Sequence, residues 1–263
     1  MSYDTLKNIF MPLLNIMKRE IEIIYEDRDL LAVNKPAGIL VHKVESFPPE
    51  ADQPLAEKLK VSEETLVDWL VKKYPEIKKV GDVPEIRPGV VHRLDKDTSG
   101  VLLIAKNQET FNYLKKQFQE RKIIKKYLAL AVGEVKQKKG EINLPIGRGK
   151  KNSLKRTAVG KTRGRLREAL TYYKILKKFN GYTLLEIQPK TGRTHQIRTH
   201  LKAIGHPLAC DRLYAGKLYQ CPAGLKRHFL HAFSLELTLP TGSRLKLEAD
   251  LPADLKNTLE KLK

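Results

Sequence analysis

The feature that most constrains the fold of this chain is a polar segment between two apolar runs, His92 to Gly100. Val90 and Val91 precede it and the apolar residues 101–105 follow it, so both flanks are expected to be short buried strands. The segment contains a histidine, an arginine and two aspartates, and it ends in a Thr-Ser-Gly turn. Charged groups fixed beside apolar walls are typical of catalytic sites, where the local dielectric constant is low. A charged surface turn is the alternative interpretation.

The rest of the chain predicts strands that pair mostly as hairpins, with helices between them. Hairpins are expected over residues 21–33, 169–188 and 235–247. Helices are expected over residues 62–74, 107–118 and 194–204 and from Pro252 onward. Ser62 and Asn107 are the expected N-caps of the first two helices, and the second hairpin turns at Asn180-Gly181. This order predicts an α+β fold, a mixed and mainly antiparallel sheet with helices packed outside.

Positive charge is concentrated in one part of the chain. Residues 121–231 contain 27 Lys and Arg against 5 Asp and Glu, whereas the remainder contains 23 against 25. A surplus placed in this way is typical of proteins that bind a polyanion, and nucleic acid fits better than a membrane surface because no amphipathic anchor accompanies it. Residues 148–167 hold nine Lys and Arg and no acid, with three glycines among them. They are expected to form a basic arm or hairpin, with a solvated loop as the alternative.

Cysteines, histidines and apolar runs give no sign of a metal site or a membrane anchor. Cys210 and Cys221 are too few for a disulfide framework or a zinc site, and the seven histidines lack metal-ligand spacing, so no metal is expected. The apolar run from Ile9 to Met17 is too short to span a bilayer and has no cleavage signal. The cytoplasm is therefore the expected location, and a membrane partner is not expected.

The central segment, HRLDKDTSGVLLIAKN (92–107), resembles the catalytic motif of the RluA-type pseudouridine synthases, which isomerise uridine in RNA to its C5-glycoside. Further stretches match in the order that the family shows: VNKPAGILVH (33–42), KKYLALAVGEV (125–135), KTGRTHQIRTHLKAIGHPLACDRLYAG (190–216) and LHAFSLEL (230–237). The resemblance implies the pseudouridine synthase fold with a central basic cleft.

The family resemblance also implies a domain organisation and a substrate class. Residues 20–263 are expected to form the catalytic domain, and residues 1–19 an N-terminal extension too short for the small separate RNA-binding domain that many relatives carry. The reaction has no role for a redox cofactor or a metal, so no cofactor is expected. The expected partner is structured RNA, with ribosomal and transfer RNA both open, and nothing demands more than a monomer.

Three residues are candidates for the chemistry. Asp95 matches the family's catalytic aspartate, which acts at C1′ of the ribose by direct attack or through a glycal; Asp97 competes with it but suits the Thr-Ser-Gly turn. Arg198 aligns with the arginine that pairs with this aspartate, and an arginine on a rigid helix can bind a carboxylate bidentately. Tyr127 aligns with the tyrosine that packs on the uracil, and Ile104 and Leu208 would complete the pocket.

Further residues are candidates for binding the RNA. An enzyme that acts on a base must extrude it, and Arg93 resembles the residue that fills the gap in relatives. The other expected RNA contacts are His92, Arg193, His195, Lys155 and Arg156. Arg193 could equally contact the backbone.

Two other function classes remain open from the residues. A non-catalytic RNA-binding or chaperone protein would explain the charge, although it would need no buried carboxylate. A base-releasing glycoside hydrolase normally uses two cooperating carboxylates, and Asp97 is the one candidate for the second.

Overall fold

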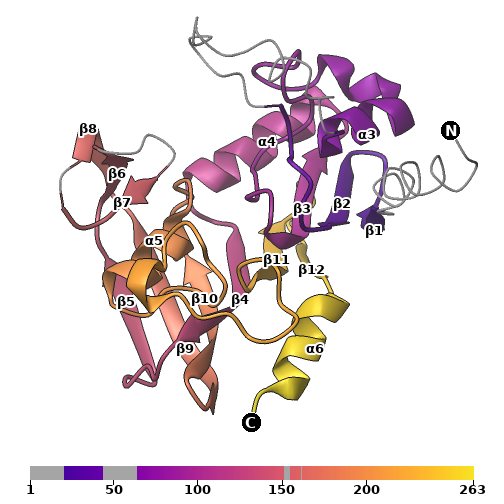
Figure 1. Cartoon of the computed structure of the whole chain (residues 1–263). Coiled ribbons are helices and arrows are strands. Elements are labelled where there is room, and N and C mark those ends of the chain that lie inside the picture. The colour runs from indigo at the N-terminus through magenta and orange to yellow at the C-terminus, as the bar shows by residue number, and fades with distance from the viewer. Residues whose placement is uncertain (1–20, 44–63, 151–154, 161) are drawn as a thin grey trace, which may run out of the picture.

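The computed structural model describes residues 21–43, 64–150, 155–160 and 162–263. Within these residues the largest element is a nine-stranded sheet (Figure 1). Its strands are β1 (Glu22–Glu26), β2 (Leu30–Lys35), β3 (Ser99–Ala105), β4 (Ile124–Val132), β5 (Lys139–Asn143), β9 (Leu170–Phe179), β10 (Tyr182–Pro189), β11 (Leu230–Thr238) and β12 (Arg244–Glu248). They lie in the order β1-β2-β3-β11-β4-β10-β9-β5, with β12 paired to β11.

Strand direction confirms the prediction of a mixed, mainly antiparallel sheet. Among the described strand pairs of this sheet, β3 and β11 are parallel and the others are antiparallel. Chain segments far apart in sequence meet at this parallel pair, where His231 lies opposite Ser99. The end of the central segment, at Ser99 and Gly100, is therefore held beside the C-terminal part of the chain.

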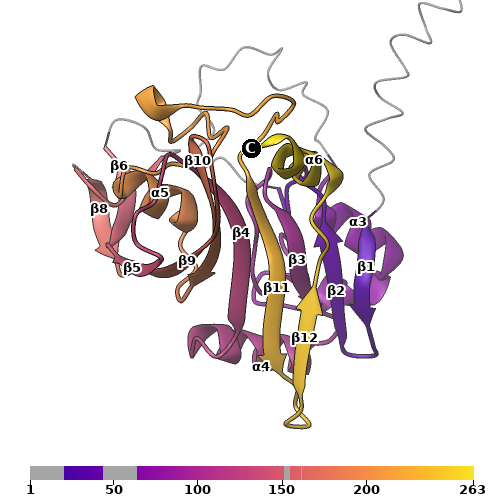
Figure 2. The same ribbon diagram turned by 90° about the horizontal axis from the view of Figure 1, so that it is seen from below.

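The basic arm is a second, smaller sheet. β6 (Ile146–Gly149), β7 (Arg156–Thr157) and β8 (Thr162–Arg167) pair in the order β7-β6-β8. Figures 1 and 2 both show it beside the β9 and β5 end of the main sheet, away from β1. The described part of residues 148–167 is thus built from strands, in keeping with the arm or hairpin expected there.

The helices lie outside the main sheet. They are α3 (Leu66–Lys73), α4 (Gln108–Gln119), α5 (Gln196–Ala203) and α6 (Ala253–Lys261), with 3-10 turns η1 (Pro75–Lys79) and η2 (Gly216–Leu218). α4 packs against β3, and α5 packs against β10 and the arm strand β7. Figure 2 shows α4 and α6 at opposite ends of the central strands β4 and β11. The predicted α+β architecture is confirmed.

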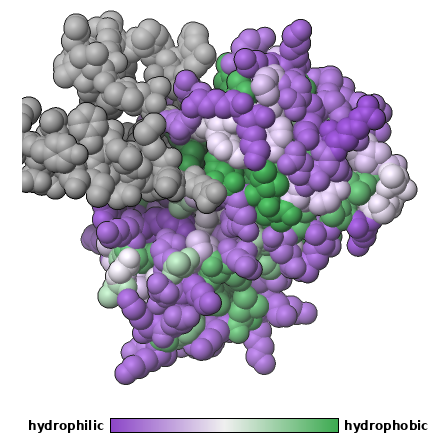
Figure 3. All heavy atoms as spheres, turned by 90° about the vertical axis from the view of Figure 1, so that its right-hand side faces the viewer, coloured by the Kyte–Doolittle hydropathy of each residue, from purple (hydrophilic) through white to green (hydrophobic). Residues whose placement is uncertain are grey.

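The core is divided between the two halves of the sheet. One buried cluster joins β2, β3, α3 and α4, and another joins β4, β10 and α5. Tyr127 of β4 packs against both clusters. The face on the β1 and α3 side is mainly hydrophilic, with a band of hydrophobic side chains across it (Figure 3). Among the described helices, none has the length and apolar character needed to cross a membrane.

Local structure differs from the sequence prediction at four places. The strand expected at Val90 and Val91 is reduced to an isolated bridge between Val90 and Ile104. α3 begins at Leu66, and its N-cap is Thr65, which forms a capping box with Asp68; Ser62 lies outside the described residues. α5 begins two residues later than predicted because His195, at φ 55°, adopts a left-handed conformation as its N-cap. The fourth difference concerns the cysteines.

The expectation that the cysteines form no disulfide framework needs correction, because Cys210 and Cys221 form one disulfide. The backbone N–H of Cys210 donates to the carbonyl of Gln220, which brings the two ends of the intervening loop side by side. Sequence spacing alone did not reveal this turn.

Candidate active site

Contacts on both sides hold the loop that carries Asp95. Thr98 Oγ1 and His228 Nε2 are 2.9 Å apart, and His92 Nε2 accepts a hydrogen bond from the backbone N–H of Leu103. The fully buried Lys35 donates to the carbonyl of Lys96, next to Asp95 in sequence. Because these partners come from β2, β3 and the segment before β11, the packed sheet fixes the position of the loop.

Gly100 allows the close contact between β3 and β11. Its φ is +119°, and a Cβ atom at this position would lie 2.1 Å from the carbonyl oxygen of Ala232. Any other residue would force the parallel strands apart and would strain the backbone. Gly100 therefore lets β3 pack closely against β11, and this contact fixes where the Asp95 loop ends.

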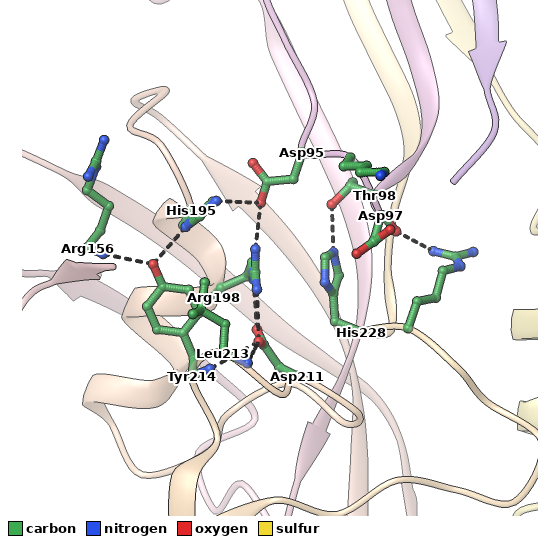
Figure 4. Close-up of polar contacts among 12 residues, drawn as sticks. Asp95, Asp97, Thr98, Arg156, His195, Arg198, Asp211, Leu213, Tyr214 and His228 are labelled. Atoms are coloured by element: carbon green, nitrogen blue, oxygen red, sulfur yellow. Dashed lines mark hydrogen bonds and ion pairs between the residues drawn. The ribbon is translucent and has the colours of Figure 1, made fainter. Parts of the chain in front are cut away.

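Arg198 lies between two carboxylates (Figure 4). Its Nη1 donates to Asp95 Oδ2 at 3.2 Å, while its Nε and Nη2 donate to the two oxygens of Asp211 at 2.8 and 2.9 Å. The exposed fractions of the side chains are 9% for Arg198, 0% for Asp211 and 20% for Asp95. Asp211 thus anchors the guanidinium from behind, and Asp95 remains accessible from the cavity.

Charge stabilises this buried triad. Burial alone would lower the pKa of Arg198, but the hydrogen bonds and charge of Asp211, and then those of Asp95, outweigh it and raise this pKa. Burial would likewise raise the pKa of Asp211, yet the Arg198 guanidinium lowers it below its usual value. Arg198 and Asp211 are therefore both ionised at neutral pH.

His195 connects Asp95 with the basic arm. Its Nε2 lies 3.8 Å from Asp95 Oδ2, and its Nδ1 lies 2.8 Å from the hydroxyl of Tyr214. That hydroxyl accepts a hydrogen bond from the backbone N–H of Arg156 in β7 (Figure 4). Burial lowers the pKa of His195 although Asp95 opposes this, so the ring is mainly neutral at pH 7. The left-handed backbone of His195 directs the ring here rather than along the face of α5.

The candidate catalytic residues open into one cavity of about 510 Å³, a size typical of ligand sites. Asp95, Tyr127 and Arg198 all line it, whereas Asp97 is exposed and does not. Among the described lining residues, Lys and Arg outnumber acids eight to one. The cavity therefore combines a carboxylate, an aromatic ring and an excess of positive charge.

Tyr127 stands on the cavity wall formed by β4. It lies opposite Ile187 of β10 and packs against both core clusters. Burial and then the negative charge of Asp95 raise the pKa of its phenol, so the hydroxyl is protonated at neutral pH. The ring is held in place from both halves of the sheet, which suits a stacking surface.

The predicted RNA-binding residues do not all occupy the cavity. His92, Arg93, Arg193 and His195 line it, but Lys155 and Arg156 do not. The His92 ring stacks on Phe118, and burial lowers its pKa to about 3, so it is neutral. Arg193 Nε donates to the backbone carbonyl of Glu168, as the alternative interpretation allowed. Contact of any of these residues with RNA stays a prediction.

Three residues at the site were not predicted from the sequence: Asp211, Tyr214 and Lys125. Asp211 and Tyr214 lie in the motif at residues 190–216, and Asp211 is the one acid within it. Lys125 is two residues before Tyr127, and this spacing places both side chains on one face of a strand. Within the described ranges, no group of three or more His, Cys, Asp or Glu is arranged to hold a metal ion.

Comparison of the sequence with known proteins points to one family. The family model of RNA pseudouridylate synthases matches residues 29–203. An uncharacterized RNA pseudouridine synthase of Bacillus subtilis is 38% identical over 247 residues, 93% of this chain and 73% of that protein. Ribosomal large subunit pseudouridine synthase D of Borreliella burgdorferi is 38% identical over 234 residues, 88% of this chain and 65% of that protein. The chain thus spans 65% to 73% of the length of these two relatives.

Solved structures share the fold. Human RNA Pseudouridylate Synthase Domain Containing 1 superposes with a TM-score of 0.66 at 26% identity, covering 89% of this chain and 84% of that chain. Human RNA Pseudouridylate Synthase Domain Containing 4 gives a TM-score of 0.67 at 23% identity, covering 100% and 99% of the two chains. The second likeness concerns the fold alone.

Proposed function

The chain belongs to the RNA pseudouridylate synthases of the RluA type, a family of isomerases, and on this premise we propose that it converts a specific uridine of structured RNA to pseudouridine, with Asp95 as the catalytic carboxylate. The observation that carries this proposal is the meeting of Asp95, Tyr127 and Arg198 in one cavity. Asp97 has no access to that cavity from its exposed position, so a second carboxylate for glycoside hydrolysis is missing among the described lining residues.

The roles of the three residues follow from their places. Asp95 Oδ acts at the ribose, either by bonding to C1′ or by removing a proton from C2′ on a glycal route, while the C1′–N1 bond breaks. Arg198, anchored by Asp211, holds the carboxylate in position. The detached uracil stays on the Tyr127 ring and turns until C5 faces C1′, because stacking tolerates rotation. The C1′–C5 bond then forms as the bond from C1′ to Asp95 breaks or, on the glycal route, as C2′ regains its proton, and the proton on C5 leaves.

The substrate we propose is large-subunit ribosomal RNA. The Borreliella relative and a 38% identical protein of Nitrosomonas europaea are both named ribosomal large subunit pseudouridine synthase D. We also propose residues 20–263 as the catalytic domain and residues 1–19 as an extension of it. A cytoplasmic location and a monomeric state stay predictions.

A tritium-release assay tests the function. Ribosomal RNA and, separately, transfer RNA carrying tritium at uridine C5 are purified from cells that lack the gene and incubated with the full chain. Release of tritium with pseudouridine in the nucleoside digest of ribosomal RNA is the expected result. Release from transfer RNA alone would show that the substrate is transfer RNA and not ribosomal RNA. Free uracil would indicate a glycoside hydrolase, and binding without release or uracil would indicate a non-catalytic RNA-binding protein.

The basic arm is proposed to contact the RNA backbone. Arg163, Arg165 and Arg167 all lie in β8 and are exposed, so three cations of this short strand are open to solvent. Replacing all three by Gln is expected to weaken RNA binding and to reduce the slope of log affinity against log salt by about 2, since each lost phosphate contact removes roughly 0.7–0.9. Filter binding across a salt series measures both quantities.

The matched control for the arm removes three exposed cations that do not line the cavity, Lys78, Arg244 and Lys256. This triple Gln variant has the same net charge as the arm variant, and its RNA affinity and salt slope should stay close to wild type. Equal losses in both variants would show that total charge rather than the arm determines binding, and the arm would then have no specific contact.

A further inference from the structure

Lys125 presents an ammonium group to the same cavity as Tyr127. The two residues are separated by one position on β4, so their side chains lie on the same face of the strand, and both line the cavity. Lys126 between them faces the other way and is not part of the lining. The cavity wall therefore carries an aromatic ring and a cation side by side, about 6.6 Å apart along the strand.

The ammonium of Lys125 has no carboxylate partner among the described residues. Its Nζ lies 5.9 Å from the centroid of the Phe118 ring, and Phe118 in turn stacks on His92. A Cβ atom added at Gly192 would lie 3.9 Å from Nζ, so the backbone at Gly192 also lies close to this ammonium. Burial lowers the pKa of this group to about 8, which leaves it mostly charged at pH 7. A partly buried cation of this kind is suited to an anion that arrives from outside the protein.

Asp95 and Lys125 both line the cavity that contains the Tyr127 ring. The charge of Asp95 raises the pKa of Tyr127, whereas the pKa shift of Lys125 comes from burial alone. Lys125 lies toward α4, where Phe118 is, and Arg198 approaches from α5. A uracil that stacks on Tyr127 with its ribose at Asp95 therefore occupies the same cavity as the Lys125 ammonium.

We infer that Lys125 is a further catalytic residue, which binds the carbonyl edge of the flipped uracil and stabilises the negative charge of the base when it is detached. This inference rests on the proposed function. Heterolysis of the C1′–N1 bond leaves the electron pair on N1, and resonance spreads it to O2 and O4. Formation of the C1′–C5 bond uses a ring electron pair, and loss of the C5 proton restores the aromatic ring, so the charge exists only between the two steps. A cation fixed beside it favours the transition state over the neutral ground state.

A phosphate contact is the competing role for this lysine, and position argues against it. Arg93 and Arg121 are exposed cations at the same cavity and are placed to meet the RNA backbone. Lys125 instead lies against an aromatic ring and a glycine backbone beside the stacking surface. The base is the part of the substrate that must enter this deeply.

The test compares Lys125→Met with Lys126→Met, the same change on the opposite face of the strand. The substrates are an RNA transcript with the modified uridine and the same transcript with 5-fluorouridine there, which makes the departing base more acidic and less dependent on external stabilisation. Single-turnover conversion of the parent nucleoside is measured after nuclease digestion. Lys125→Met should lose about 100-fold with uridine and clearly less with 5-fluorouridine, with unchanged RNA affinity. Lys126→Met should match wild type on both.

Other outcomes would overturn the inference. Equal losses on both transcripts, with weaker binding and a smaller salt slope, would make Lys125 a phosphate contact. Wild-type rates in the Lys125→Met variant would mean that Lys125 has no role in catalysis. Should that variant fail to fold, Lys125→Gln replaces it, and Lys125→Arg, which keeps the charge, should recover most of the rate. A wild-type chain that forms no pseudouridine would refute the proposed function itself, a result independent of these comparisons.

Discussion

Asp95→Asn is expected to lower the rate of pseudouridine formation by about 10⁴-fold while leaving folding and RNA affinity close to wild type. The amide has the shape of the carboxylate and still offers an oxygen to Arg198 Nη1, but it can neither bond to C1′ as a nucleophile nor accept a proton. The pair between Arg198 and Asp211 does not depend on Asp95, so the guanidinium should stay in place. Single-turnover tritium release and filter binding measure the two effects.

Asp97→Asn is the matched control for this prediction. Asp97 is in the same loop but is exposed, and the contact recorded there is through its backbone carbonyl, which accepts from Arg227. Its substitution should leave turnover within a few-fold of wild type. An inactive Asp97→Asn variant beside an active Asp95→Asn variant would transfer the catalytic role to Asp97. Loss of RNA affinity in Asp95→Asn would mean that the aspartate serves binding rather than chemistry.

Local sequence signals predicted most of the elements because those signals act over a few residues. Asn107 accepts from the backbone N–H of Thr110 as an N-cap, and β9 and β10 turn at Asn180-Gly181 as their sequence indicates. The mainly antiparallel pairing also followed from the hairpin pattern. The parallel pair of β3 and β11 did not, since it joins residues more than a hundred positions apart.

The arrangement of the site needed the three-dimensional structure for the same reason. The family resemblance suggested the arginine for Asp95, but not that Asp211 holds its other edge, because that contact depends on the turn after α5. The helix expected over residues 194–204 also included His195, whereas this residue is the left-handed N-cap before α5 and its ring contacts Tyr214 and faces Asp95. Hydrophobic periodicity carries no information on a single residue with positive φ.

The position of the arm gives the site a physical link to RNA binding. The backbone of Arg156 in β7 bonds to Tyr214, Tyr214 bonds to His195, and His195 faces Asp95. A change in the arm can therefore alter the surroundings of the carboxylate without touching the substrate. This is why the arm variant proposed above changes only β8 and leaves Arg156 intact.

Asp211→Asn is expected to destabilise the fold by about 3 kcal/mol and to lower turnover at the same time. The carboxylate is fully buried, accepts from Arg198 Nε and Nη2, and also accepts from the backbone N–H groups of Leu213 and Tyr214. Removing one partner of a buried ion pair leaves the other charge uncompensated, which costs roughly 3–5 kcal/mol. Urea unfolding monitored by circular dichroism measures the loss.

Acid unfolding provides a second readout for Asp211. Its pKa is lower in the folded protein than the ordinary value, so its contribution to stability is present above the unfolded pKa and is lost as pH falls through the folded pKa. Wild type should therefore lose stability below about pH 4 more steeply than Asp211→Asn, whose amide does not titrate. If the free energy of unfolding fell with pH at the same slope in the two proteins, Arg198 would not depend on this carboxylate.

Asp254→Asn is the matched control, because Asp254 also binds an arginine through two oxygens but is 43% exposed. Arg227 is 10% exposed, but water reaches the pair from the Asp254 side and Arg227 keeps other hydrogen bonds, so this variant should lose clearly less stability than Asp211→Asn. The contrast with Asp95→Asn then separates chemistry from scaffold: Asp95→Asn loses turnover at constant stability, whereas Asp211→Asn loses both through Arg198. If Asp211→Asn were as stable as Asp254→Asn, the buried triad would not be what positions the catalytic carboxylate.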